Sequence, residues 1–355
     1  MSHILIGPLP VAYDSIGGAK VAFAEFVAFY EAYAPYDFRV LNTSRSVAGV
    51  TGVTRLYRNV RHSLALFFLA LRTIKKNDVV VLNISRSGIF TLAPPIILLT
   101  RLKSASIAIR YFGGNPHSYI RHKNSLVRWL YVKIIGSVDL ILCETHNILQ
   151  FLSNYCDVAW FPNGRDFKMK SESRLKIQRI LCLSQLKKAK GIPELIAAAP
   201  LLDDGLKLDI VGPNIDCEDI ISTAALNNVH ISGAVEPQDI PELYDQYDLV
   251  VLPTKRSDDG YPGVIIEALQ KGIPVVCSDL PNLAELITDC ENGIRVPAGS
   301  FVALAEAINK LARDEQLYMQ CCRGAILTGQ RFRSRIIFQN VVTKLARLST
   351  EECNH

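Results

Sequence analysis

One stretch near residue 250 constrains the fold more than any other, because it sets a strand, a turn and a helix in a fixed order. The run Leu249–Pro253 is continuously apolar, which predicts a strand buried on both faces of a parallel sheet. A glycine-containing turn at 259–263 follows it and leads into a helix. Gly272 and Pro274 end that helix before a second apolar strand at 275–277. The sequence therefore predicts a βαβ unit within an α/β fold.

The turn of this unit has the composition of an anion site. In a parallel sheet, the loop after a strand opens onto a helix amino terminus, where free N–H groups and the helix dipole hold negative charge. Gly260 and Gly263 let a diphosphate approach the backbone. Glu267, about one turn into the helix, can accept both hydroxyls of a ribose. Together these residues favour a site for a nucleotide sugar.

Asp259 and Glu267 flank a Gly-aromatic-Pro turn, and in this the chain resembles glycosyltransferase family 4, the retaining GT-B enzymes, of the bacterial surface-polysaccharide type. The resemblance implies two Rossmann-like domains with mostly parallel sheets that face a central cleft. It also gives Asp259 a catalytic role, although the family commonly has Glu at this position. The implied donor-binding residues of the segment are Gly260, Tyr261, Pro262, Gly263, Val264 and Glu267.

A glycine pair before the first predicted helix resembles a second donor-binding loop of the family. Gly17 and Gly18 follow the first predicted strand and open the helix that begins near Lys20. Two residues without side chains leave their N–H groups open to a sugar diphosphate. Many loops carry such a pair for structural reasons alone. The assignment of Gly17 and Gly18 to donor binding therefore depends on the resemblance, because the family has a similar glycine loop at this place, facing the cleft.

The loop that follows the first strand of the second half resembles the family's phosphate-binding segment, in which an Arg and a Lys hold the donor. Lys190 matches that Lys, whereas Gln185 stands where Arg is commonest. The diphosphate that leaves during transfer gains charge that must be neutralised. Lys187 or Lys188 can supply the missing cation, although lysine clusters are more often simply solvated.

A third loop, after a strand of the first half, joins the candidate site through its resemblance to the family. Gly113 and Gly114 clear room for a ligand, and Arg110 and Asn115 are predicted to contact the acceptor or the sugar. His117 is predicted to assist proton removal from the acceptor. A lone histidine is more often structural, so this role depends on its place beside the glycine pair.

The modest net charge of +5 hides an asymmetry between the halves. Residues 1–170 hold 20 Lys and Arg against 9 Asp and Glu, and the remainder holds 19 against 25. A basic half indicates an anionic partner, either a membrane face or a phosphorylated acceptor. Nucleic acid is disfavoured, because no recognised binding motif or aromatic stacking pattern accompanies the charge.

Two predicted helical stretches, 56–76 and 121–133, mix cations with aromatic and long aliphatic side chains. Such helices can lie on an anionic bilayer, and ordinary packing on the sheet explains the pattern equally well. No apolar run reaches the roughly 18 to 20 residues that span a bilayer. The first residues lack the basic leader of a secretory signal. We therefore expect a cytoplasmic protein with peripheral contact at the inner face of the plasma membrane.

At 355 residues, the chain exceeds a single hydrophobic core, and strands alternate with helices along both halves. A turn-rich stretch at 161–166 precedes a polar run and indicates a linker. We predict an acceptor-binding Rossmann-like domain over 1–168 and a nucleotide-sugar-binding one over 174–335. By resemblance, the last helix, within 336–355, crosses back to pack on the first domain.

No metal and no cofactor beyond the co-substrate are expected. The nine cysteines form no C-x-x-C pair, which argues against a disulfide framework and a zinc site. No isolated Asp-x-Asp motif lies in a donor loop, in agreement with the metal independence that the resemblance implies. The co-substrate is expected to be a nucleotide diphosphate sugar, with UDP favoured over GDP.

The resemblance implies a retaining hexosyltransferase that moves a sugar to a hydroxyl of a lipid-linked or oligosaccharide acceptor in O-antigen, capsule or exopolysaccharide assembly. A GT-B nucleotide-sugar epimerase is one alternative, and it would need no acceptor. A catalytically degenerate, partner-binding homologue is another, suggested by Asp259 and Gln185. The sequence also leaves open whether Asp259 attacks covalently or stabilises an oxocarbenium ion.

Overall fold

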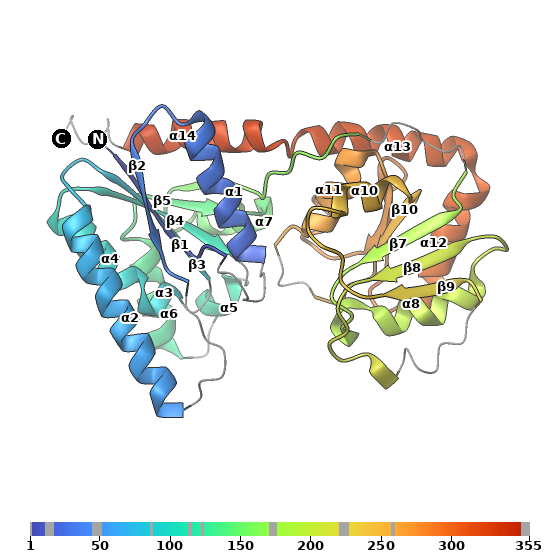
Figure 1. Ribbon diagram of the computed structural model, residues 1–355, viewed down its shortest axis with the longest axis horizontal. Coiled ribbons are helices and arrows are strands. Elements are labelled where there is room, and N and C mark those ends of the chain that lie inside the picture. Colours follow the sequence, from blue (N-terminus) through green and yellow to red (C-terminus); the bar gives the residue numbers. More distant parts are fainter. Residues whose placement is uncertain are drawn as a thin grey trace. The chain divides into compact units, whose positions relative to one another are not determined.

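The computed structural model describes residues 2–10, 18–44, 52–85, 88–112, 116–121, 124–169, 176–219, 227–256 and 260–348. Its internal contacts divide the chain into two compact units. Unit 1 comprises Met1–Asn163 with Arg335–His355, and unit 2 comprises Gly164–Ser334. Each unit is an α/β layer structure built on its own parallel sheet (Figure 1).

Unit 1 holds a six-stranded sheet in the order β2-β1-β3-β4-β5-β6, in which every neighbouring pair is parallel. Its strands are β1 (His3–Gly7), β2 (Phe38–Asn42), β3 (Val79–Ser85), β4 (Ser106–Phe112), β5 (Leu140–Cys143) and β6 (Val158–Trp160). Its helices are α1 (Gly18–Tyr33), α2 (Gly52–Thr73), α3 (Gly88–Thr91), α4 (Ala93–Leu102), α5 (His117–Ile120), α6 (Ser125–Ile135), α7 (His146–Leu152) and α14 (Ser334–Leu348). Central strands such as β3 are buried, as their apolar runs predict.

Two hydrophobic clusters cover the sheet of unit 1. One cluster includes side chains of α2, α3, α4, α6 and α7, and the other includes those of α1 and α14. Phe338 of α14 lies with its ring centroid 4.8 Å from that of Phe29 and 5.6 Å from that of Phe26. The last helix of the chain is thus part of the core of unit 1.

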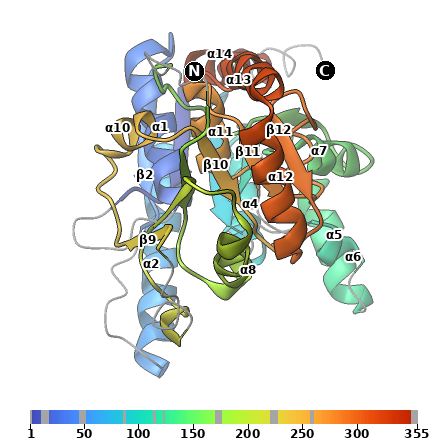
Figure 2. The same cartoon turned by 90° about the vertical axis from the view of Figure 1, so that its right-hand side faces the viewer.

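Unit 2 holds a second parallel six-stranded sheet, in the order β12-β11-β10-β7-β8-β9. Its strands are β7 (Arg179–Leu183), β8 (Lys207–Val211), β9 (Val229–Ser232), β10 (Leu249–Leu252), β11 (Val275–Ser278) and β12 (Gly293–Val296). Its helices are η1 (Lys188–Lys190), α8 (Ile192–Ala198), η2 (Ala199–Leu201), α10 (Ile240–Asp245), α11 (Gly263–Lys271), α12 (Phe301–Arg313) and α13 (Glu315–Gln330). Helix α11 packs against β10, β11, α10 and α13 (Figure 2).

The predicted βαβ unit is confirmed as β10-α11-β11. Val250 of β10 pairs in parallel with Val275 of β11. Helix α11 ends where Gly272 adopts a left-handed φ of 77°, a conformation that glycine accepts without strain. Among the helices that the structure describes, none is long and apolar enough to span a bilayer.

The buried His3 of β1 makes the stability of unit 1 depend on pH. Its Nδ1 lies 2.9 Å from the Tyr30 hydroxyl, and its ring stacks on Tyr36. Its Nε2 is buried with no hydrogen-bond partner among the described residues. Burial lowers the pKa of His3 to about 4, against a smaller opposing effect of Asp78. Below pH 6.5 the unfolded chain therefore binds a proton that the folded chain does not.

We accordingly predict that the free energy of unfolding falls by about 3 kcal/mol between pH 7.5 and pH 4, at 1.36 kcal/mol for each pH unit between the two pKa values. Urea unfolding of the wild type and of His3→Phe at both pH values measures this, and the variant should lose less stability on acidification. Equal losses in the two proteins would assign the pH dependence to other groups.

Candidate functional site

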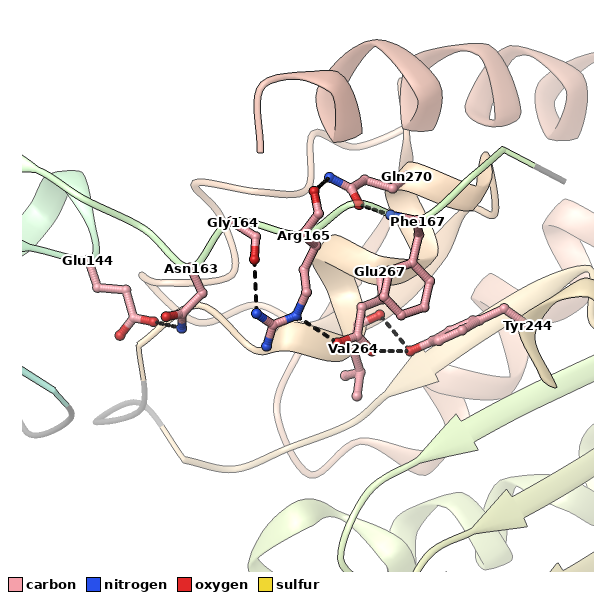
Figure 3. Close-up of polar contacts among 9 residues, drawn as sticks. All are labelled: Glu144, Asn163, Gly164, Arg165, Phe167, Tyr244, Val264, Glu267 and Gln270. Atoms are coloured by element: carbon pink, nitrogen blue, oxygen red, sulfur yellow. Dashed lines mark hydrogen bonds and ion pairs between the residues drawn. The ribbon is translucent and has the colours of Figure 1, made fainter. Parts of the chain in front are cut away.

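The carboxylate of Glu267 on α11 is held from two sides within unit 2. Its side chain is 12% exposed, and its Oε1 accepts a hydrogen bond from Nε of Arg165 at 3.0 Å (Figure 3). Its Oε2 accepts one from the Tyr244 hydroxyl, also at 3.0 Å. A carboxylate oxygen has two lone pairs, so each oxygen can accept one more donor. A pair of neighbouring hydroxyls, as on a ribose, meets this requirement.

Tyr244 of α10 is a buried donor at this site. Its hydroxyl also lies 3.2 Å from the carbonyl oxygen of Val264, in the first turn of α11. Burial, with Glu267 as a second cause, raises the pKa of Tyr244 well above its usual value. The phenol therefore stays protonated at neutral pH and keeps donating to the carboxylate.

Gln270 fastens the chain segment at the start of unit 2 to the same helix. It lies one turn after Glu267 and is buried. Its Nε2 donates to the carbonyl of Arg165 at 2.7 Å, and its Oε1 accepts from the backbone N–H of Phe167 at 2.9 Å (Figure 3). These bonds hold residues 164–167 to unit 2, whose boundary with unit 1 falls between Asn163 and Gly164, within the turn-rich stretch at 161–166.

The turn that precedes α11 is anchored by its aromatic residue. Tyr261 is buried, its hydroxyl donates to Glu285, and its ring packs edge-on against Phe332. Asn282 donates to the carbonyl of Gly260 at 3.0 Å. The Tyr261 side chain is thus used to anchor the turn within unit 2. The backbone of the turn is the part suited to the predicted donor contact.

The loops after β7 and β10 touch each other through their backbones. Gly191 has a left-handed φ of 79°, and a Cβ built on it would lie 2.0 Å from the carbonyl oxygen of Pro253. The N–H of Lys255 donates to the carbonyl of Ala189 at 3.0 Å. Lys190, the cation predicted to bind donor phosphate, is therefore part of a loop packed directly on the end of β10.

The lysines around Lys190 differ in their surroundings. Lys188 pairs with Asp219 at 3.0 Å on the exposed surface. Lys187 is partly buried and precedes η1, whereas Gln185 is exposed and brings no charge. Of the two candidates to replace the missing arginine, Lys187 is thus the one for which the structure shows no carboxylate partner among the described residues.

Arg110 of β4 lies deep in unit 1. It is 2% exposed, its guanidinium stacks over the Phe161 ring at 3.9 Å, and it donates to Ala22 and to Asn163. Asn163 in turn donates to Glu144, which follows β5 (Figure 3). The Arg110 guanidinium thus supports the chain before the unit boundary, and a sugar contact by this residue stays a prediction.

Several predicted site residues lie outside the described residues: Gly17, Gly113, Gly114, Asn115 and Asp259. Gly18 begins α1 and His117 begins α5, with the His117 side chain also outside the description. Within the described ranges, no group of three His, Cys, Asp or Glu side chains is placed to hold a metal ion.

Sequence reasoning missed Arg165, Tyr244 and Gln270. The contact of Arg165 with Glu267 joins positions 102 residues apart, and that of Phe167 with Gln270 joins positions 103 apart. No local pattern marks such a pairing. The turn-rich stretch that contains Arg165 signals a boundary and gives no hint of a side-chain role.

The whole chain shares its fold with a nucleotide-bound structure. It superposes on the crystal structure of Anabaena HepE in complex with UDP with a TM-score of 0.73, at 17% identity, over 98% of this chain and 100% of that one. Two parallel-sheet units and this likeness define the fold as GT-B, as the sequence predicts.

The sequence comparisons identify unit 2 more closely. Residues 165–327, which make up most of unit 2, match the family of glycosyl transferases group 1. One relative is N,N'-diacetylbacillosaminyl-diphospho-undecaprenol alpha-1,3-N-acetylgalactosaminyltransferase of Campylobacter jejuni. The two chains are 30% identical over 152 residues, which cover 42% of this chain and 39% of that protein.

A second relative comes from Staphylococcus aureus. The capsular polysaccharide biosynthesis glycosyltransferase CapM is 28% identical over 172 residues, which cover 45% of this chain and 43% of that protein. The matches therefore span about two fifths of the length of these curated relatives.

The close packing of the phosphate-loop glycine gives a prediction. Gly191→Ala should destabilise the protein by about 3 kcal/mol or more, because alanine is strained at positive φ and its Cβ overlaps the Pro253 carbonyl. Gly205→Ala is the matched control: its φ is 88°, and among the described residues no atom beyond its chain neighbours lies within 4 Å of the added Cβ. It should cost only about 1 kcal/mol. Urea unfolding measures both, and similar losses would refute the contact as the cause.

Proposed function

We propose that this protein is a glycosyltransferase that moves a sugar from a nucleotide diphosphate sugar to a hydroxyl of an acceptor in surface-polysaccharide assembly. The observation that carries the proposal is the Glu267 carboxylate, fixed by two donors and able to accept two more, at the helix that follows β10. The match of residues 165–327 to the group 1 glycosyl transferases supports it. The name of the Staphylococcus aureus relative supports a surface polysaccharide as the product, and the name of the Campylobacter jejuni relative supports a lipid-linked acceptor.

The donor is assigned mainly to unit 2, and a UDP-sugar is favoured because UDP is the ligand in the structurally similar HepE. In this proposal Glu267 accepts the two ribose hydroxyls. Lys190 and Lys187 neutralise the diphosphate, together with the N–H groups of Gly260, Tyr261, Gly263 and Val264. Gly17 and Gly18 of unit 1 contribute further N–H groups.

The chemistry is proposed to follow the retaining, metal-independent course of family 4. Asp259 acts at the anomeric carbon, and His117 assists proton removal from the acceptor hydroxyl. Gly113, Gly114 and Asn115 come shortly before His117 in the sequence, and together with Arg110 they are proposed to make up the acceptor side. Exclusion of water protects the donor from hydrolysis.

The acceptor is proposed to be lipid-linked or an oligosaccharide, reached from the cytoplasmic face of the membrane. Helix α6 of unit 1 supports this proposal, because it exposes apolar side chains beside cations. Leu126 is 66% and Trp129 is 56% exposed, while Arg128 and Lys133 lie on the same helix, which contains no acidic residue. Aromatic and cationic groups together suit an anionic bilayer surface.

Nucleotide binding tests the function directly. In a thermal-shift panel of UDP, GDP and ADP, UDP should raise the melting midpoint most, because only ligands of the folded state do so. Glu267→Gln should weaken UDP binding by about 10-fold or more, since the amide offers one acceptor in place of two. Glu242→Gln removes an exposed acid from α10 and should leave binding unchanged.

Failure of all three nucleotides to bind the folded wild type would refute the proposal. An epimerase is separated by product analysis, because it would convert the free nucleotide sugar without any acceptor. A degenerate homologue is separated by the same assay, because it would bind the nucleotide and form no product even when acceptor is supplied.

Vesicle binding tests the membrane contact. The wild type should sediment with vesicles of phosphatidylglycerol, and less with phosphatidylcholine, because the cations of α6 add attraction to burial of its apolar groups. The pair Leu126→Ala and Trp129→Ala should cut binding by about 10-fold. Leu102→Ala, which removes an even more exposed apolar group from α4 of the same unit, is the control. Equal loss in the control would show that α6 has no special role.

A further inference from the structure

Arg165 is the second residue of unit 2, yet its side chain is 13% exposed and is held on several sides. Its Nε donates to Glu267, and its Nη1 donates to the carbonyl of Gly164 at 2.9 Å. Figure 3 shows the guanidinium between the chain segment that enters unit 2 and helix α11. Its third nitrogen, Nη2, lies 3.2 Å from where a Cβ would stand on Gly263.

The backbone of Arg165 is as firmly held as its side chain. Its N–H donates to the carbonyl of Phe332 at 2.9 Å. Its own carbonyl accepts from the N–H of Ser334 at 3.2 Å and from Gln270 at 2.7 Å. The guanidinium therefore extends from a fixed base, so little further ordering is needed when a ligand arrives.

We propose that Arg165 is a positioning residue of the donor site, which fixes the Glu267 carboxylate to receive the two ribose hydroxyls of a nucleoside diphosphate sugar. This inference rests on the function proposed above and adds to it a residue that touches Glu267 and not the reacting atoms. Gly263 contributes to this arrangement of Arg165 and Glu267, because the absence of a side chain leaves the space that the guanidinium occupies.

Geometry is the first reason. A free glutamate side chain samples many rotamers, and binding a diol with both oxygens requires only one of them. Arg165 holds Oε1 and Tyr244 holds Oε2, so the plane of the carboxylate is set before the ligand binds. One acceptor position on each oxygen is left for one ribose hydroxyl.

Charge is the second reason. The donor brings a diphosphate close to the amino terminus of α11, and an unpaired carboxylate within the same helix would repel it. The Arg165 guanidinium neutralises Glu267 in a partly buried setting, where solvent screens the pair less than at an exposed site. Glu267 can then accept hydroxyl groups without opposing the phosphates.

The close approach of Gly263 to the ion pair predicts that substitutions at residues 263 and 165 are energetically coupled. A Cβ on residue 263 would approach both Arg165 Nη2, at 3.2 Å, and Glu267 Oε1, at 3.3 Å. Both distances are tighter than ordinary carbon contacts, so alanine at 263 should displace the ion pair. Once the arginine is removed, the same alanine meets one neighbour fewer and should matter much less.

The test is calorimetric binding of UDP and of 2′-deoxy-UDP to the full chain. The wild type should prefer UDP by about 10-fold, because the deoxy nucleotide leaves one Glu267 acceptor without a partner. Arg165→Met should weaken 2′-deoxy-UDP by about 3-fold, because the diphosphate then faces an unpaired carboxylate. It should weaken UDP by about 30-fold, because the carboxylate also loses its position toward the ribose, and so abolish the preference. Arg165→Lys keeps the charge without the planar fork and should fall between the two.

Two further variants complete the design. Arg313→Met breaks an ion pair with Asp203 elsewhere in unit 2 and should change neither affinity nor preference. Gly263→Ala should weaken UDP in the wild type by about 5-fold and change it by less than about 2-fold in Arg165→Met. If Arg165→Met does not fold, Arg165→Lys with and without Gly263→Ala provides the same comparison.

The outcomes separate this inference from the function on which it rests. If the wild type binds no nucleoside diphosphate, the proposed function fails. If the wild type binds UDP and folded Arg165→Met keeps both the affinity and the preference for the ribose, the function stands and the role of Arg165 is overturned. Additive effects of Gly263→Ala and the arginine variants would likewise overturn the coupling.

Discussion

The fastening of the first residues of unit 2 to helix α11 is the interaction on which the candidate site depends. Glu267 and Gln270 lie one turn apart on that helix and both bind residues 164–167, one through the Arg165 side chain and the other through the backbone. The face of α11 that is proposed to bind the donor therefore also fixes the chain segment at the start of unit 2. Substitution of Glu267 or of Gln270 should therefore affect both the local structure and ligand binding.

The parallel sheet explains why the candidate residues gather in loops. All strands of a parallel sheet end at the same edge, so loops distant in sequence become neighbours there. In unit 2 the pairing of β10 with β7 places the loop of Lys190 against Pro253, and Gly191 permits backbone contact between them. The chemistry of a nucleotide sugar needs a diol acceptor and phosphate partners at one place, and this edge supplies candidates for both.

The fold could be predicted from the sequence because its signals are local. Apolar runs such as 249–253 and the helix stop at Gly272 mark element boundaries without reference to the rest of the chain. The surroundings of individual side chains could not be predicted in this way. Tyr261 stands beside Gly260 in a site-like turn and Arg110 lies near the end of β4, shortly before a glycine pair, yet both side chains are buried within their own units. Arg165 is the opposite case: its sequence neighbours do not mark it as a site residue, because its contact with Glu267 depends on tertiary packing alone.

Helix α14 has a consequence for how the chain is made. Phe338, Val341 and Leu345 belong to the same hydrophobic cluster as Phe26 of α1. The ribosome produces that helix only after all of unit 2, so unit 1 waits with one face of its sheet incompletely covered while the rest of the protein is synthesised. Unit 2, by contrast, is continuous in sequence and can complete its own core first. The order of folding in the cell is therefore expected to run against the order of the chain.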